Sequence, residues 1–273
     1  MATTPKRLDV TELDFDEIKD NLKVFLKGQT EFTDYDFEGS GMNILLDTLA
    51  YNTHYLAFNA NMLANEMFLD SSALRSSVVS HAKTLGYVPQ SPRAATATVE
   101  VALTTTNATA TMSAGTVFNT TIDGTSFTFV NPTETTATNI GNAVVFSNLV
   151  LYEGTYVTSR YTVDTQDVEQ RFLINEDRVD TRTLTVKVQN SSSDSTTTTY
   201  TLADDIAAVT STSNVYFLQE AENNQFEVYF GDGVLGKGLS DDNIVILQYV
   251  VSNKAEGNGA TSFTSAGAID GIS

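Results

Sequence analysis

The hydrophobic period of this chain changes once, near Pro92, and that change limits the folds open to it. Before Pro92, apolar residues recur every three or four positions, which is the spacing of one face of an α-helix. From about Ala94 onward apolar and polar residues alternate, for example in Leu184, Val186 and Val188. A period of two indicates half-buried strands in mainly antiparallel sheet. The pattern predicts an α+β protein, with an N-terminal helical domain built on one long helix and a mainly antiparallel β region after it.

Three segments follow from composition and period. Residues 1–92 are predicted to form a helical domain that binds partners, and residues 93–255 a mainly β scaffold domain. Residues 256–273 are rich in Gly, Ala and Ser, and we expect them to be a tail that leads into a further C-terminal region. At 273 residues the chain is long enough for two domains with real cores.

Three helices are expected in the first segment. The first is capped by Asp14 or Thr11 and ends near Gly28, and the third runs over about residues 72–85. Between them a long helix is predicted from about Gly41 to Phe68, with a length of about 40 Å at about 1.5 Å per residue.

The long helix carries two apolar stripes, whereas a surface helix needs only one. The first stripe contains mostly Leu, Ala and Met, at Met42, Leu45, Leu46, Leu49, Ala50, Leu56, Ala57, Ala60, Leu63, Ala64 and Met67. The second stripe is more aromatic, at Ile44, Tyr51, Tyr55, Phe58 and Met62. Either the two short helices cover both stripes, or one stripe docks onto another chain. We take the second stripe as the hypothetical partner interface.

A turn crowded with glycine separates two strand-like runs, 226–230 and 244–251. Its sequence, Gly-Asp-Gly-Val-Leu-Gly-Lys-Gly, places glycines where positive φ is possible and an aspartate that can bond backbone N–H groups. The turn lacks the Gly-Lys-Ser/Thr ending of a phosphate loop, and a strand follows it instead of a helix. A calcium site on Asp232, Asp241 and Asp242 is the weaker alternative, because their spacing matches no known calcium loop. The pattern predicts a structural turn between two adjacent antiparallel strands, formed by Gly231, Asp232, Gly233, Gly236 and Lys237.

Composition argues against several classes of function. The formal charge is −19 without a basic stripe, so binding to nucleic acid or to an anionic membrane is not expected. The chain has no cysteine, and its only histidines are His54 and His81, without a zinc-protease pattern around them. We expect no catalytic residue, no cofactor, no metal and no small-molecule substrate, and therefore no enzyme.

Three stretches resemble the baseplate wedge subunits of T-even-like contractile-tailed bacteriophages, in the baseplate J-like family. They are residues 13–41, with Phe-Thr-Asp-Tyr-Asp-Phe-Glu-Gly-Ser-Gly at the end; residues 49–89, with Leu-Ala-Tyr-Asn-Thr-His-Tyr and Leu-Gly-Tyr-Val-Pro; and the turn Phe-Gly-Asp-Gly-Val-Leu-Gly-Lys at 230–237. The turn is shared broadly by baseplate J-like proteins, and the first two stretches are specific to the T-even-like branch.

The resemblance implies a structural protein of the virion tail baseplate, assembled in the cytoplasm of the host bacterium. It further implies two copies per wedge, N-terminal helices that join a helical core bundle with another wedge subunit, and contacts that link neighbouring wedges around the tail tube. Family members are usually longer than 273 residues, which leaves the wedge-linking role open for this chain. The competing interpretation is a receptor-binding or adhesin-like virion module, for which aromatic-rich exposed loops or repeats would be expected.

Overall fold

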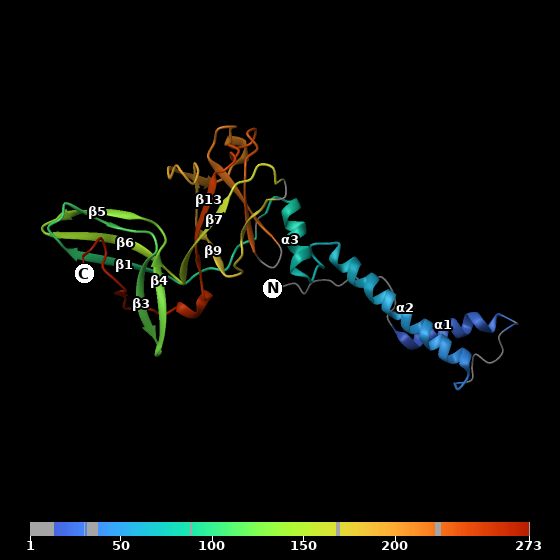
Figure 1. The fold of residues 1–273 in the computed structure, drawn as a ribbon. Helices are drawn as coiled ribbons and strands as arrows, with labels where there is room; N and C mark the ends of the chain where they lie inside the picture. Colours follow the sequence, from blue (N-terminus) through green and yellow to red (C-terminus); the bar gives the residue numbers. More distant parts are fainter. Residues whose placement is uncertain are drawn as a thin grey trace. The chain divides into compact units, whose positions relative to one another are not determined.

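A computed structural model gives the structure of residues 14–29, 31, 38–87, 89–167, 170–221 and 225–272. The chain divides into two compact units, residues 1–88 and residues 89–273. The first unit is helical and the second consists mainly of strands, so the predicted α+β class is confirmed (Figure 1).

The helical unit contains α1 (Phe15–Lys27), α2 (Gly41–Glu66) and α3 (Arg75–Thr84). Asp14 caps α1 by accepting hydrogen bonds from the backbone N–H groups of the first turn. Helix α1 packs along the N-terminal half of α2 (Figure 1), where Lys19 Nζ lies 2.5 Å from Asp47 Oδ1. The three helices lie close to their predicted positions.

The corner between α2 and α3 is held by Glu66. Residue Leu74, at the N-cap of α3, makes no side-chain cap, and the Glu66 carboxylate takes over this role by accepting from the backbone N–H groups of Ala73 and Leu74. The hydrogen bond from Ser77, together with these backbone bonds, lowers the pKa of Glu66. His81 Nε2 lies 2.9 Å from the Glu66 carbonyl oxygen, which gives this histidine a structural contact.

The described strands of the second unit form two seven-stranded sheets. The first sheet contains β1 (Thr96–Thr104), β2 (Thr109–Met112), β3 (Thr116–Ile122), β4 (Thr125–Asn131), β5 (Thr135–Ile140), β6 (Ala143–Glu153) and β14 (Thr264–Ser265). The second contains β7 (Thr155–Thr162), β8 (Phe172–Ile174), β9 (Val179–Gln189), β10 (Thr197–Leu202), β11 (Val215–Glu220), β12 (Phe226–Phe230) and β13 (Ile244–Val251). All pairs are antiparallel except β10 with β11.

Each sheet has its own apolar core. The core of the first sheet includes the buried side chains of Met112, Phe129 and Leu151. The core of the second sheet includes those of Val186, Phe226 and Leu247. Strand β13 lies between β7 and β9 and is apolar on both faces, as a central strand requires.

The expected pairing of 226–230 with 244–251 is wrong. Strand β12 pairs with β11 and β8, whereas β13 pairs with β7 and β9, so the glycine turn does not join adjacent strands. The physical reason is that β13 is apolar at every position except Gln248 and fits the middle of the sheet. The long connection over residues 231–243 lets the chain cross to that position.

The C-terminal segment, expected from composition to be a Gly/Ala/Ser-rich tail, packs on the first sheet. Strand β14 pairs with β3, and Ile269 is buried in the core of the first sheet. Asp270 accepts a hydrogen bond from the backbone N–H of Thr111 on β2. Although the segment is rich in small residues, the apolar side chains of Phe263 and Ile269 pack against the core of the first sheet.

Candidate partner-binding helix

Helix α2 begins where its sequence provides a cap. Ser40 Oγ accepts from the backbone N–H of Asn43 at 3.0 Å, and Gly41 opens the helix. The helix ends at Glu66, with Met67 as its C-cap. Along the helix Asp47 and Glu66 are the only acidic residues, and it carries no Lys or Arg. A helix of this length with so few charges is unusual for a surface exposed to water on most sides.

Only a narrow strip of α2 is buried. Its buried residues are Asn43, Leu46, Ala50 and Asn61. Leu46 and Ala50 belong to the first predicted stripe. The structure divides that stripe, because Met42 is half-buried and the other large side chains in it are exposed. Those exposed side chains are Leu45, Leu49, Leu56, Leu63 and Met67.

The second stripe is exposed along its whole length. Its five side chains, with exposed fractions between 44% and 62%, are Ile44, Tyr51, Tyr55, Phe58 and Met62. The rings of Tyr51 and Tyr55 lie 5.5 Å apart between their centroids, so they form one aromatic surface. Their role as an interface stays a prediction.

Polar residues separate the two exposed apolar stripes. At 3.6 residues per turn, Thr48, Asn52 and Asn59 fall between the aromatic stripe and the leucine-rich stripe. All three are exposed. The exposed arc of α2 therefore consists of two apolar strips with a polar strip between them, and this pattern suits two neighbouring helices better than one.

The glycine-rich turn is held by a dense set of local bonds. Asp232 Oδ1 accepts from the backbone N–H groups of Leu235 (3.0 Å) and Val234 (2.9 Å), and these bonds lower the pKa of Asp232. Gly233 and Gly236 have φ of +85° and +88°, in the region that favours glycine. A Cβ on Gly231 would lie 2.3 Å from the carbonyl carbon of Gly236, so only glycine fits there.

The turn is also fastened to the loop before β11. Gly236 N donates to the Thr210 carbonyl oxygen and Lys237 N to that of Ser213, at 3.1 and 2.9 Å. Asp241 accepts from Thr165 on a different segment. Among the described residues, no three His, Cys, Asp or Glu side chains are grouped as they would be around a metal ion. A structural role for the five turn residues stays a prediction.

Sequence reasoning missed the buried carboxylates of the β unit, among them Asp180 and Glu153. Asp180 is fully buried, forms an ion pair with Arg182 and accepts from the backbone N–H of Ala94. Glu153 is also buried and accepts two hydrogen bonds from Asn253. Both carboxylates are bonded to other groups of this chain, which indicates a structural role. In the part of the chain that the structure describes, no helix is long and apolar enough to cross a membrane.

Comparison with known proteins places this fold in a class. Residues 14–87 match the helical domain of the gp6-like baseplate wedge proteins, and residues 159–258 match the third domain of bacteriophage baseplate wedge protein gp6. These two matches define a phage baseplate wedge subunit. Over 280 aligned residues the chain is 31% identical to baseplate wedge protein gp6 of Enterobacteria phage T4, covering 94% of this chain and 41% of that relative. The chain belongs to the T4-like baseplate wedge family, and it spans about two fifths of the length of the relative it matches.

Proposed function

We propose that this protein is a structural, non-enzymatic component of a bacteriophage tail baseplate wedge, and that α2 is the element by which it joins other wedge subunits. The observation that carries the proposal is the two exposed apolar strips of α2. Contiguous apolar surface of this kind usually marks an interface. The helix lies within the 14–87 match to the wedge family, which gives the class of partner.

The two strips suggest two helical neighbours. One is a second copy of this chain and the other a helix of a different wedge subunit, so that α2 takes part in a helical bundle. Aromatic residues such as Tyr55 and Phe58 supply large contact area at low cost in side-chain entropy and are frequent at the centres of interfaces. The β unit would then act as scaffold that helps link wedges around the tail tube. The proposed place of action is the virion baseplate, after assembly in the host cytoplasm.

Co-expression with the other wedge subunits of the same phage tests this proposal. The double variant Tyr55→Ala with Phe58→Ala removes two exposed rings, and we expect assembly to weaken by at least about 2 kcal/mol, which is roughly thirtyfold. The matched control is Asn52→Ala with Asn59→Ala, which changes the polar strip of the same helix. Native mass spectrometry of the purified complexes reports both the assembly and the number of copies.

The thermal transition of each isolated protein completes the experiment. Unchanged transitions with loss of assembly in the aromatic variant alone support the proposal. If the aromatic variant assembles normally but unfolds at a lower temperature, these rings belong to an internal core and the proposal fails. Formation of no complex with any wedge subunit, together with binding to host cells, would favour the receptor-binding alternative.

A further inference from the structure

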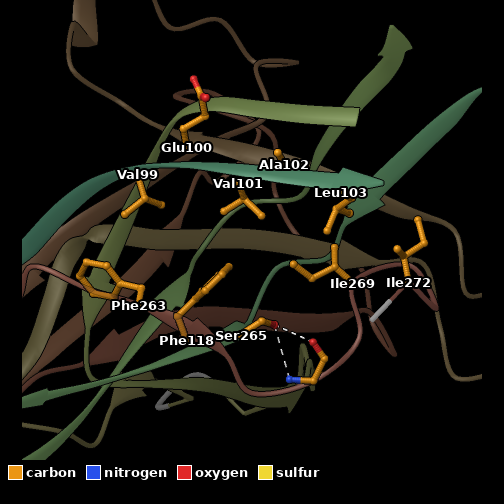
Figure 2. Close-up of a pocket in the computed structure, with 11 residues that line it drawn as sticks. Val99, Glu100, Val101, Ala102, Leu103, Phe118, Phe263, Ser265, Ile269 and Ile272 are labelled. Atoms are coloured by element: carbon orange, nitrogen blue, oxygen red, sulfur yellow. Dashed lines mark hydrogen bonds between the residues drawn. The ribbon is translucent and has the colours of Figure 1, made fainter. Parts of the chain in front are cut away.

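The first sheet has an open edge beside an apolar cavity. Among the described residues β1 pairs only with β6, so one side of this nine-residue strand carries no partner strand. A cavity of about 410 Å³ lies between β1 and the C-terminal segment. Figure 2 shows the apolar side chains of β1 pointing toward that segment across the cavity, whose main apolar lining is Val99, Val101, Leu103, Phe263, Ile269 and Ile272.

The inward residues of β1 are incompletely covered. Val99, Val101 and Leu103 alternate along the strand and are only partly buried, although they pack against the core of the first sheet. Strands in the middle of a sheet bury such residues almost fully, as Val245 and Leu247 of β13 do. The half-burial of β1 and its unpaired edge occur at the same place.

The charge around this edge has one sign. No Lys or Arg occurs between Arg93 and Arg160, or after Lys254, so the strands of the first sheet contain no cationic side chain. The sheet does contain Glu100, on β1, whose carboxylate points away from the cavity (Figure 2). An anionic edge disfavours a second copy of the same anionic sheet and favours a cationic segment.

We propose that β1 accepts an extended strand from a different protein, with aliphatic residues at alternate positions and Lys or Arg between them. The strand would add to the free edge of β1 through backbone hydrogen bonds. Because side chains alternate along a strand, its aliphatic residues would enter the cavity while its cationic residues lie on the face of Glu100. This site is separate from α2 and does not depend on the function proposed for that helix.

The unpaired edge of β1 has an alternative explanation, which predicts that no peptide binds there. The register of β1 with β6 shifts between Val99 and Val101, and a bulge with an outward carboxylate is a known way of protecting an edge from pairing. Under that explanation no extended peptide binds.

Peptide titration of the full chain separates the two. The probe is a fluorescein-labelled nine-residue peptide of alternating valine and lysine, followed by fluorescence anisotropy. Two matched peptides replace all lysines by glutamate or all valines by serine. We expect binding of the valine–lysine peptide only, because it alone combines the apolar pattern with the complementary charge. Slower hydrogen exchange over residues 96–104 in its presence would locate the binding at β1.

Variants of β1 test the same site. Val101→Ser should weaken binding about tenfold by removing one apolar wall. Thr98→Ser, on the opposite face of the strand and outside the cavity lining, should leave binding within about twofold. Glu100→Gln should weaken it about threefold by removing the complementary charge. If Val101→Ser lowers the thermal transition of the protein, Val99→Thr takes its place.

Three results would overturn the proposal. They are no binding of the valine–lysine peptide, equal binding of the serine–lysine peptide, and binding that is indifferent to Val101→Ser and Val99→Thr. A concentration-dependent dimer in sedimentation, abolished by Val101→Ser, would assign the edge to a second copy and would likewise refute the occupant proposed.

Discussion

The carboxylate of Glu153, at the end of β6, accepts hydrogen bonds from both the backbone N and the Nδ2 of Asn253, each at 2.8 Å. The two residues are 100 positions apart, and each lies where the chain passes from one sheet toward the other. Glu153 is 1% exposed, and a Cβ added at Gly257 would lie only 2.5 Å from Glu153 Cγ. This pair fixes the junction between the two sheets.

Removing the carboxylate should cost substantial stability. Glu153→Ala removes a buried carboxylate together with its two hydrogen bonds to Asn253, so we expect a loss of roughly 2–4 kcal/mol in the free energy of unfolding. Urea denaturation followed by tyrosine fluorescence measures it. Glu134→Ala, at an exposed carboxylate in the loop between β4 and β5, is the control and should change stability by less than about 0.5 kcal/mol. Equal effects of the two substitutions would show that the junction does not depend on Glu153.

The glycine turn offers a pair of substitutions with different physical causes. Gly231→Ala forces a Cβ to within 2.3 Å of backbone, whereas Gly233→Ala meets no atom within 4 Å and pays only for a φ of +85°. We expect a loss of roughly 1 kcal/mol for Gly233→Ala and a larger loss, above about 2 kcal/mol, for Gly231→Ala. Chemical denaturation of both variants gives the comparison. A Gly231→Ala protein as stable as the wild type would contradict the close approach of Gly231 to the backbone of Gly236.

The sequence predicts those parts of the architecture that are determined by residues close to one another in the chain. The ends of α2 follow from Ser40, Gly41 and a long apolar pattern, and these signals act within a few residues. Strands rich in Thr, Ala and Asn, such as β2 and β5, have little apolar alternation, so a period of two does not predict them. Their position is fixed by pairing with neighbours, which no local pattern encodes.

The candidate site shows the same division. The aromatic stripe of α2 was readable from its spacing, because the positions of side chains around a helix depend only on the helical period. The division of the other stripe into buried Leu46 and Ala50 and an exposed leucine strip depends on where α1 packs. The partner of Glu153 could not be found from the sequence either, since the contact closes over 100 residues.

Acid should loosen the corner between α2 and α3. The pKa of Glu66 is lowered below its usual 4.5 by the bond from Ser77 and the backbone bonds from Ala73 and Leu74. The unfolded chain therefore binds more protons at this residue than the folded chain does in the range below about pH 4.5. Its stabilising contribution is fully present above that value and is lost as the pH falls through the folded pKa. Hydrogen exchange of the first turn of α3, followed from about pH 6 to pH 3 with correction for intrinsic exchange, should show this opening.

Glu66→Gln is the control for that experiment, because the amide keeps one acceptor oxygen and does not titrate. We expect the variant to lose the pH dependence of opening at α3 while keeping the helix at neutral pH. A variant whose opening follows the same pH profile as the wild type would assign the titration to another group.

The two halves of the divided stripe of α2 should respond oppositely to truncation. Leu46 is 3% exposed, so Leu46→Ala should cost roughly 2–4 kcal/mol through lost burial and a residual cavity. Leu63 is 68% exposed, so Leu63→Ala should change the stability of the isolated protein by less than about 0.5 kcal/mol. Urea unfolding followed by the helical circular dichroism signal tests both. Co-expression with the wedge subunits should give the opposite order of effects. Leu63→Ala should reduce assembly, because Leu63 belongs to the exposed leucine-rich stripe of α2, which is the second surface proposed to contact a helix. A large stability loss for Leu63→Ala in the isolated protein would mean that this strip is already covered within the chain, leaving α2 with one docking surface instead of two.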